Sequence, residues 1–181
     1  MLLALVACSG SSGGSDAADE PTTTAVTSTT AASAGPVAAG KGSVNLGGSE
    51  QPFTVTGCVD GPGEGDTPEA TQQFRLTGTT DGTPEFTVTI TRYTSDSGNG
   101  VTTVTETATI GQGAGEAAVG IEAKRTSIDG KWLDLKDPSV QSALLTRRGT
   151  LVVVDGLFGP EGSQKGDSDI VAGTIRARCP A

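Results

Sequence analysis

Apolar side chains alternate with threonine along much of the chain after residue 50, and this alternation limits the possible fold more than any other feature. Thr54 separates Phe53 from Val55, and residues 86–91 read Phe-Thr-Val-Thr-Ile-Thr. A period of two places successive side chains on opposite faces of a strand, one apolar and one polar. β-Branched Thr, Val and Ile favour such a half-buried surface. The pattern therefore predicts a mainly β domain.

Other candidate strands and turn dipeptides divide the rest of the chain. The candidate strands are 53–58, 74–77, 85–93, 101–110, 151–154 and 170–177. Asp-Gly or Asn-Gly pairs, which suit tight turns, occur at 81–82, 99–100, 129–130 and 155–156. The runs 85–93 and 101–110 form the clearest hairpin. Strands at this spacing predict an antiparallel sandwich or a strongly curved sheet over residues 43–181.

One short helix is predicted over residues 138–148. Asp137 suits the N-cap, Pro138 the first helical position and Gly149 the position after the last turn. The apolar residues at 140, 143 and 144 would share one helix face, and the arginine pair at 147–148 suits the helix C-terminus. We expect this helix to lie against the sheet, with the apolar residues at 132, 133 and 135 adding to the core.

The amino terminus has the pattern of a bacterial lipoprotein. An apolar run ends in Leu5-Val6-Ala7-Cys8, which matches a lipobox. Residues 1–7 are interpreted as the end of a signal peptide cleaved before Cys8, whose thiol would then carry lipid and hold the exported protein on the outer face of the cell membrane or envelope. This run is shorter than a usual signal peptide and has no basic residue before it, so we expect the true start to lie upstream. The alternative is a chance apolar terminus with a free thiol.

Residues 8–42 are predicted to form a disordered tether. They are rich in Ser, Gly, Ala, Thr and Pro and contain almost no bulky apolar side chain, so burial cannot offset the entropy of ordering them. Threonine clusters beside proline resemble an O-glycosylated stalk, although an unmodified spacer has the same composition. The candidate glycosylation sites are Thr22, Thr23, Thr24, Thr27, Thr29 and Thr30.

Two cysteines remain once Cys8 is assigned to lipid. Cys58 lies in an early candidate strand, and Cys179 lies two residues from the C-terminus. An exported chain meets oxidising conditions, so a disulfide between them is predicted. A metal-binding or reactive pair is the alternative, but the chain has no histidine and no second Cys-x-x-Cys to complete a metal site.

Several functional classes lack the residues they need. The absence of histidine excludes Ser-His-Asp triads, Cys-His dyads and imidazole metal ligands. The net charge of −9 argues against a nucleic-acid partner, because phosphates require Lys and Arg clusters. We therefore expect no enzymatic activity, no cofactor and no metal. The arginine-containing pairs 124–125 and 147–148 are interpreted as solvent-exposed.

An acidic loop leaves one metal-site alternative open. Asp60, Glu64, Asp66 and Glu69 could supply oxygen ligands to Ca²⁺, but their order is not that of an EF-hand. A solvated acidic loop has the same composition.

The arrangement of these features resembles the mycobacterial 19 kDa lipoprotein antigen family. The resemblance lies in the lipobox, in Val44-Asn45-Leu46-Gly47-Gly48 leading to Val55-Thr56-Gly57-Cys58, in Tyr93-Thr94-Ser95, and in Val154-Asp155-Gly156 followed by Ile175-Arg176-Ala177-Arg178-Cys179. It implies a surface-exposed, acylated and often glycosylated envelope protein that host receptors recognise through its lipid. No enzymatic activity is established in that family.

These observations lead to one main functional expectation and two alternatives. The main one is a non-catalytic, lipid-anchored envelope protein whose domain acts as an interaction or antigenic module, with a host receptor or envelope component as partner. The first alternative is a carrier of an apolar envelope lipid or other small ligand, held in a cavity under the helix. The second is a glycan hydrolase that uses carboxylates alone, for which no acid–base pair can be assigned.

Overall fold

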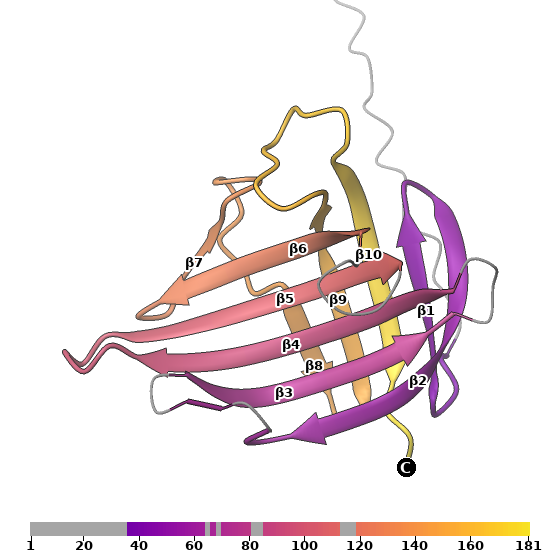
Figure 1. The fold of residues 1–181 in the computed structure, drawn as a ribbon, viewed down its shortest axis with the longest axis horizontal. Helices are drawn as coiled ribbons and strands as arrows, with labels where there is room; N and C mark the ends of the chain where they lie inside the picture. Colours follow the sequence, from indigo (N-terminus) through magenta and orange to yellow (C-terminus); the bar gives the residue numbers. More distant parts are fainter. Residues whose placement is uncertain (1–35, 64–65, 68–69, 81–84, 113–118) are drawn as a thin grey trace, which may run out of the picture. The chain divides into compact units, whose positions relative to one another are not determined.

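The computed structural model describes residues 36–63, 66–67, 70–80, 85–112 and 119–181, and their strands form a single antiparallel sheet (Figure 1). The strands are β1 (Lys41–Leu46), β2 (Ser49–Asp60), β3 (Ala70–Thr79), β4 (Phe86–Asp96), β5 (Thr102–Gln112), β6 (Val119–Ile128), β7 (Lys131–Asp134), β8 (Leu145–Arg148), β9 (Leu151–Phe158) and β10 (Val171–Arg178). The mainly β prediction is confirmed. None of the described residues forms a helix that could span a membrane.

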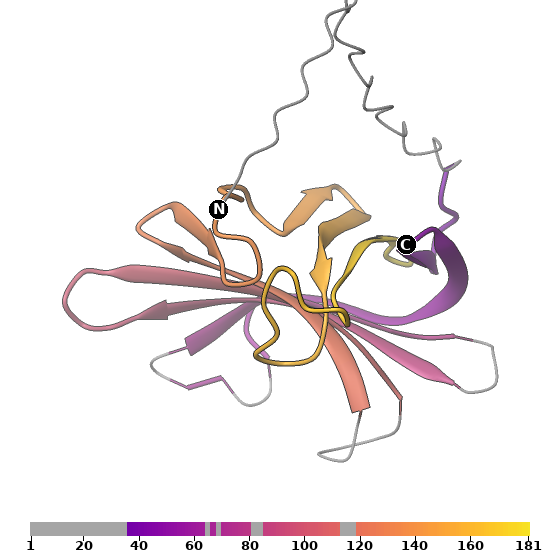
Figure 2. The same cartoon turned by 90° about the horizontal axis from the view of Figure 1, so that it is seen from above.

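The sheet consists of two meanders joined where the first and last strands pair. Its order is β7-β6-β5-β4-β3-β2-β1-β10-β9-β8, so β1 lies between β2 and β10. The sheet curls until its two arms meet: the backbones of Glu122 on β6 and Gly159 after β9 exchange hydrogen bonds of 2.8 and 3.1 Å. The result is a half-barrel, so the curved sheet is the correct one of the two predicted architectures. In Figure 2 the arm formed by β8–β10 lies over one face of β3–β6.

The inner face of the half-barrel holds the apolar core. Phe74, Leu76, Val88 and Ile90 on one arm are almost fully buried. They belong to one continuous cluster with the buried side chains of β9 and β10, which include Val152, Val154 and Ile175. Every second residue of these strands therefore points inward, as the alternation in the sequence predicts.

The outer face of the sheet is formed largely by threonine. Thr77, Thr89 and Thr109 lie directly opposite one another on β3, β4 and β5, and Thr91 lies opposite Thr107. All five are partly exposed. Threonine combines a β-branched carbon with a hydroxyl group, which suits a strand position that faces solvent on one side.

A close approach of one aromatic ring explains two glycines in neighbouring strands. The buried Phe53 ring on β2 lies over Gly42 on β1 and Gly78 on β3. A Cβ on Gly78 would lie 2.5 Å from the ring, and one on Gly42 would overlap the ring as well. The two glycines thus give the ring its place in a core that has few aromatic residues.

The predicted helix over residues 138–148 is wrong. Residues 135–144 form turns and irregular backbone, here called the strap, and β8 follows at Leu145. The Asp137 carboxylate does accept hydrogen bonds from the Ser139 backbone N–H and hydroxyl, at 3.2 and 2.6 Å. An aspartate N-cap makes the same kind of hydrogen bond, but here the bond closes a turn. No helix follows, because Arg125 and Glu106 on the sheet bind the backbone at residues 143–145.

Two more sequence expectations need correction. Leu133 and Leu135 do not add to the core; they are 50% and 81% exposed. The Asp155-Gly156 pair lies inside β9 and forms no turn. Gly156 is there because a Cβ at this position would lie 2.7 Å from the Leu144 side chain. The hairpin predicted from 85–93 and 101–110 is confirmed as β4 and β5.

Candidate functional site

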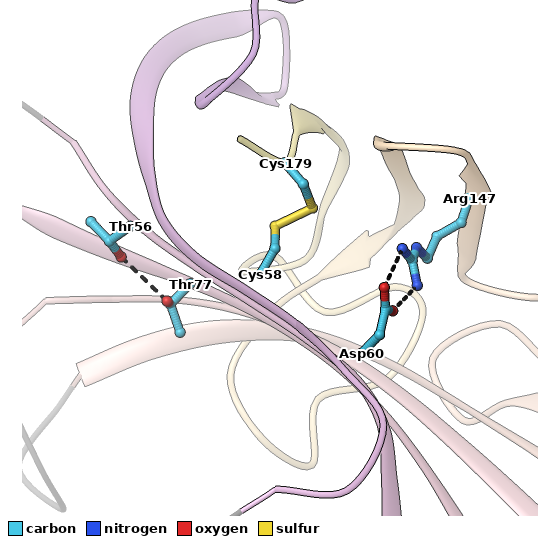
Figure 3. The surroundings of a disulfide bond; sticks show 6 residues. All are labelled: Thr56, Cys58, Asp60, Thr77, Arg147 and Cys179. Atoms are coloured by element: carbon cyan, nitrogen blue, oxygen red, sulfur yellow. Dashed lines mark hydrogen bonds and ion pairs between the residues drawn. A yellow bond between two sulfur atoms is a disulfide. The ribbon is translucent and has the colours of Figure 1, made fainter. Parts of the chain in front are cut away.

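A disulfide joins the start of the domain to its end. Cys58 on β2 and Cys179 just after β10 are bonded, with a Cα–Cα distance of 5.8 Å (Figure 3). The predicted pairing is confirmed. Neither cysteine is available as a metal ligand or a nucleophile while the bond is present.

An ion pair beside the disulfide connects β2 to β8. Both guanidinium NH groups of Arg147 donate to the Asp60 carboxylate (Figure 3). The Arg147 guanidinium also lies 4.2 Å from the centre of the Phe74 ring. Arg147 lowers the pKa of Asp60 below its usual value, chiefly through the hydrogen bond. Arg147 therefore bridges two distant strands, although the sequence suggested a solvated position at a helix end.

A row of charged residues crosses the inner face of the sheet from β4 to β7. Phe74 on β3 lies opposite Arg92 on β4, which lies opposite Glu106 on β5. Glu106 in turn lies opposite Arg125 on β6, and Arg125 lies opposite Asp134 on β7. Directly opposed residues share a face of the sheet, so four charges of alternating sign stand side by side. We call Arg92, Glu106, Arg125 and Asp134 the charged row.

Glu106 is the most deeply buried member of the charged row. Its side chain has no exposed surface, and one carboxylate oxygen accepts hydrogen bonds of 2.8 and 2.9 Å from the backbone N–H groups of Leu144 and Leu145. The other oxygen lies 2.6 Å from the guanidinium of the half-exposed Arg92. Burial is the largest effect on this carboxyl and raises its pKa above the usual value, against the opposing effect of the two N–H groups and Arg92.

Arg125 and Asp134 hold the strap from the other side. Arg125 Nε donates to Asp134 at 2.8 Å, and its Nη1 donates to the carbonyl oxygens of Ser142 and Ala143 at 3.4 and 2.9 Å. The second oxygen of Asp134 accepts the N–H of Lys136 at 2.8 Å. Glu106 and Arg125 thus bind backbone groups at residues 142–145 that a helix would have paired internally, and Asp134 binds the backbone where the strap begins. These charges bind backbone, which is a structural role.

The cavity beneath the strap and β8 is polar. It has a volume of about 430 Å³, and its lining includes Arg125, Ser142, Thr146 and Asp155. The apolar cavity under residues 138–148, which the alternative carrier function needs, is therefore not found at this position in the described part of the chain.

An apolar pocket lies instead near the turn between β1 and β2. Its volume is about 480 Å³, within the range of small-molecule sites. Three of its lining side chains are buried core residues, namely Val44, Val88 and Ile110. Three more are partly buried: Leu46, Phe86 and Ile121. Six aliphatic or aromatic side chains from β1, β4, β5 and β6 thus surround a space that can hold an apolar group.

Polar but uncharged side chains complete this pocket. Ser49, Gln51 and Gln112 are exposed and lie at its opening, whereas Thr80 is 8% exposed. The Thr80 hydroxyl accepts a 2.8 Å hydrogen bond from the Phe86 N–H and keeps its own proton to donate. No lining residue identified in the described ranges is charged. Sequence reasoning missed this pocket, because its residues continue the ordinary strand alternation.

The remaining candidate site residues fall in two groups. Cys8 and the six tether threonines lie outside the described residues, as do Glu64 and Glu69 of the acidic loop. Asp66 accepts backbone N–H groups from Gly63 and Gln72, each at 3.0 Å, so it stabilises its own loop. Among the residues that the structure describes, no cluster of three or more potential metal ligands was found.

Comparisons of the chain with protein-family models, curated proteins and solved structures found no match.

Proposed function

We propose that this chain is an exported, non-catalytic binding protein of the cell envelope, anchored by lipid on Cys8. The observation that carries the proposal is the lipobox Leu5-Val6-Ala7-Cys8, followed at once by a polar tether. The Cys58–Cys179 disulfide supports it, because such bonds persist outside the reducing cytosol. Two or three acyl chains would hold the protein stably on a bilayer.

Metabolic labelling with palmitate in a bacterial host that processes lipoproteins tests the anchor. The wild-type chain, expressed behind a complete signal peptide, should incorporate label and partition into detergent. Cys8→Ala should not incorporate label, and the neighbouring Ser9→Ala should behave as wild type. Label in the Cys8→Ala protein would refute the anchor.

The resemblance to the mycobacterial 19 kDa lipoprotein antigen family supports a surface role for the anchored domain. Under this proposal the lipidated terminus is the part that a host receptor would recognise, and the tether carries O-linked sugars on its threonines. Intact mass of the secreted Cys8→Ala protein tests the sugars, since unmodified tether threonines would give the mass of the polypeptide alone.

A second function, binding of an apolar ligand, is favoured by the pocket near the β1–β2 turn. The sheet encloses about 480 Å³ between largely apolar side chains there. Burial of apolar ligand surface contributes roughly 25 cal/mol per Å², which is the main source of affinity in such a site. The domain would then act as a carrier or sensor of an envelope lipid.

Native mass spectrometry and Nile red fluorescence of the Cys8→Ala protein test the pocket. We expect Nile red to bind and Leu46→Glu to abolish this binding, because a carboxylate in the apolar lining must be desolvated. Leu46→Met should retain binding. Leu135→Glu is the matched control, since the same substitution there falls on a side chain that is 81% exposed. Equal dye binding by Leu46→Glu and wild type, with both folded, would refute the pocket as the site.

A further inference from the structure

The chemistry around the apolar pocket restricts which ligand it can hold, provided that the proposed apolar-ligand function is correct. Its lining combines the six apolar side chains named above and Pro160 with four neutral hydrogen-bonding ones, at Ser49, Gln51, Thr80 and Gln112. Hydroxyl and amide groups can both donate and accept, so they pair with alcohols, esters and amides alike. Among the lining residues that the structure describes, none is a cation that could pair with a carboxylate or a phosphate.

The electrostatic surroundings also disfavour an anionic ligand. Residues 43–181 carry 18 acidic and 11 basic side chains, a net charge of −7. Glu50 lies between Ser49 and Gln51 in the chain, and Glu85 precedes Phe86. A carboxylate at the opening, held against the buried Thr80, would lose part of its hydration without gaining an ion pair, and the net negative domain would repel it.

The size of the pocket limits the ligand to one chain. A volume of about 480 Å³ is in the lower half of the usual range for small-molecule sites. The six apolar side chains come from strands that are adjacent in the sheet or meet across its curl, so they surround a single space. A lipid with two or three chains would leave most of its hydrocarbon outside.

We infer that the pocket binds one acyl or alkyl chain that carries an uncharged head group, such as an alcohol, ester or amide, and discriminates against free fatty acids. The chain contacts Val44, Val88 and Ile110, and the head group lies at the opening beside Gln51 and Gln112. Thr80 donates its hydroxyl proton to an oxygen of the head group. The discrimination arises from the missing cation, so one added cation should reverse it.

Displacement of Nile red from the Cys8→Ala protein by oleamide and by oleate tests this inference, because these two ligands share one hydrocarbon chain and differ in the head group. At neutral pH oleamide should bind at least tenfold more tightly than oleate, a difference of about 1.4 kcal/mol. Gln51→Lys should reverse the preference. Gln164→Lys, an added cation on an exposed glutamine that does not line the pocket, should leave it unchanged.

The outcomes separate this inference from the proposed function on which it rests. Equal binding of both ligands, or tighter binding of oleate, would overturn the neutral-head inference while leaving the pocket as an apolar site. Displacement by neither ligand, together with unchanged Nile red binding in Leu46→Glu, would refute both. Oleamide preference that Gln51→Lys does not alter would place the discrimination elsewhere and overturn the assigned head-group position.

Discussion

Removal of the Glu106 carboxylate should release the strap from the sheet. One oxygen of this side chain accepts the N–H groups of Leu144 and Leu145, and both leucines are almost fully buried. Glu106→Ala leaves these two N–H groups without an acceptor. Glu106→Gln retains a carbonyl oxygen that can accept both, but it removes the charge that faces Arg92.

The two variants should lower the free energy of unfolding by different amounts. Each buried N–H without a partner costs about 1–3 kcal/mol, so Glu106→Ala, which leaves two of them, should lower the free energy of unfolding by about 2–6 kcal/mol. Arg92 is 36% exposed, so loss of its ion pair costs at most about 1 kcal/mol, and removal of a buried charge offsets this cost; Glu106→Gln should therefore change the free energy of unfolding by less than about 1 kcal/mol. Thr107→Ala, on the outer face one residue away, should change stability by less than about 0.5 kcal/mol.

Urea denaturation and amide hydrogen exchange of these variants, all in the Cys8→Ala chain, measure the effect. Exchange of the Leu144 and Leu145 amides should accelerate strongly in Glu106→Ala and only slightly in Glu106→Gln. If the two variants lose equal stability, or if Glu106→Ala costs less than about 1 kcal/mol, the strap is held by something other than these hydrogen bonds.

The pH dependence of the same comparison has a definite sign. Burial raises the pKa of Glu106 in the folded protein above 4.5, its ordinary value. The stability linked to this shift is fully present below pH 4.5 and is lost as pH rises through the folded-state pKa. Wild type should therefore gain stability relative to Glu106→Gln as the pH is lowered through this window. A difference that does not vary with pH would contradict the raised pKa.

Three further predictions concern other parts of the domain. Replacement of both bridging cysteines by alanine should lower the free energy of unfolding by about 5 kcal/mol, given the 121-residue separation, as measured in urea against the oxidised protein; a loss below about 1 kcal/mol would contradict the loop-entropy account. Gly42→Ala should cost about 1–3 kcal/mol in thermal unfolding because its methyl group would overlap the buried Phe53 ring, and an unchanged melting temperature would show that the ring moves freely. Lys165→Met should raise the pKa of Asp137 from about 2 toward 3.8 in an NMR titration, because the Lys165 hydrogen bond is the main cause of the lowered pKa. An unmoved pKa would exclude Lys165 as the cause. The stability linked to this carboxyl is present above pH 3.8 and is lost as pH falls toward 2.

Local pattern was sufficient to predict the β class, the β4–β5 hairpin and the disulfide. Alternation of side chains is fixed by strand geometry, so Phe86, Val88 and Ile90 could be assigned to one face without any structure. The disulfide followed because only two cysteines remained in a chain that its amino-terminal pattern predicts to be exported. These features depend on residues that are close in sequence or few in number.

The strap and the pockets depend on contacts between residues that are far apart in the chain, and the local sequence pattern does not predict such contacts. Asp137-Pro138 has the local chemistry of a helix start, but Glu106 and Arg125, far away in the chain, bind the backbone at residues 142–145. Arg125 resembled a surface residue because its partner Asp134 lies on the next strand at a register that only the fold defines. The apolar pocket depends on where the sheet curls, and no single segment of the sequence indicates the position of the curl.

The position of the disulfide also determines how the protein responds to proteolysis. Any single cut between Cys58 and Cys179 leaves two fragments that each contain one of the bonded cysteines, so they remain covalently joined. A single cut in the loops of the domain therefore cannot release a piece of it without a reductant. A cut on the amino-terminal side of β1 instead separates the whole disulfide-closed domain from the preceding residues in one step.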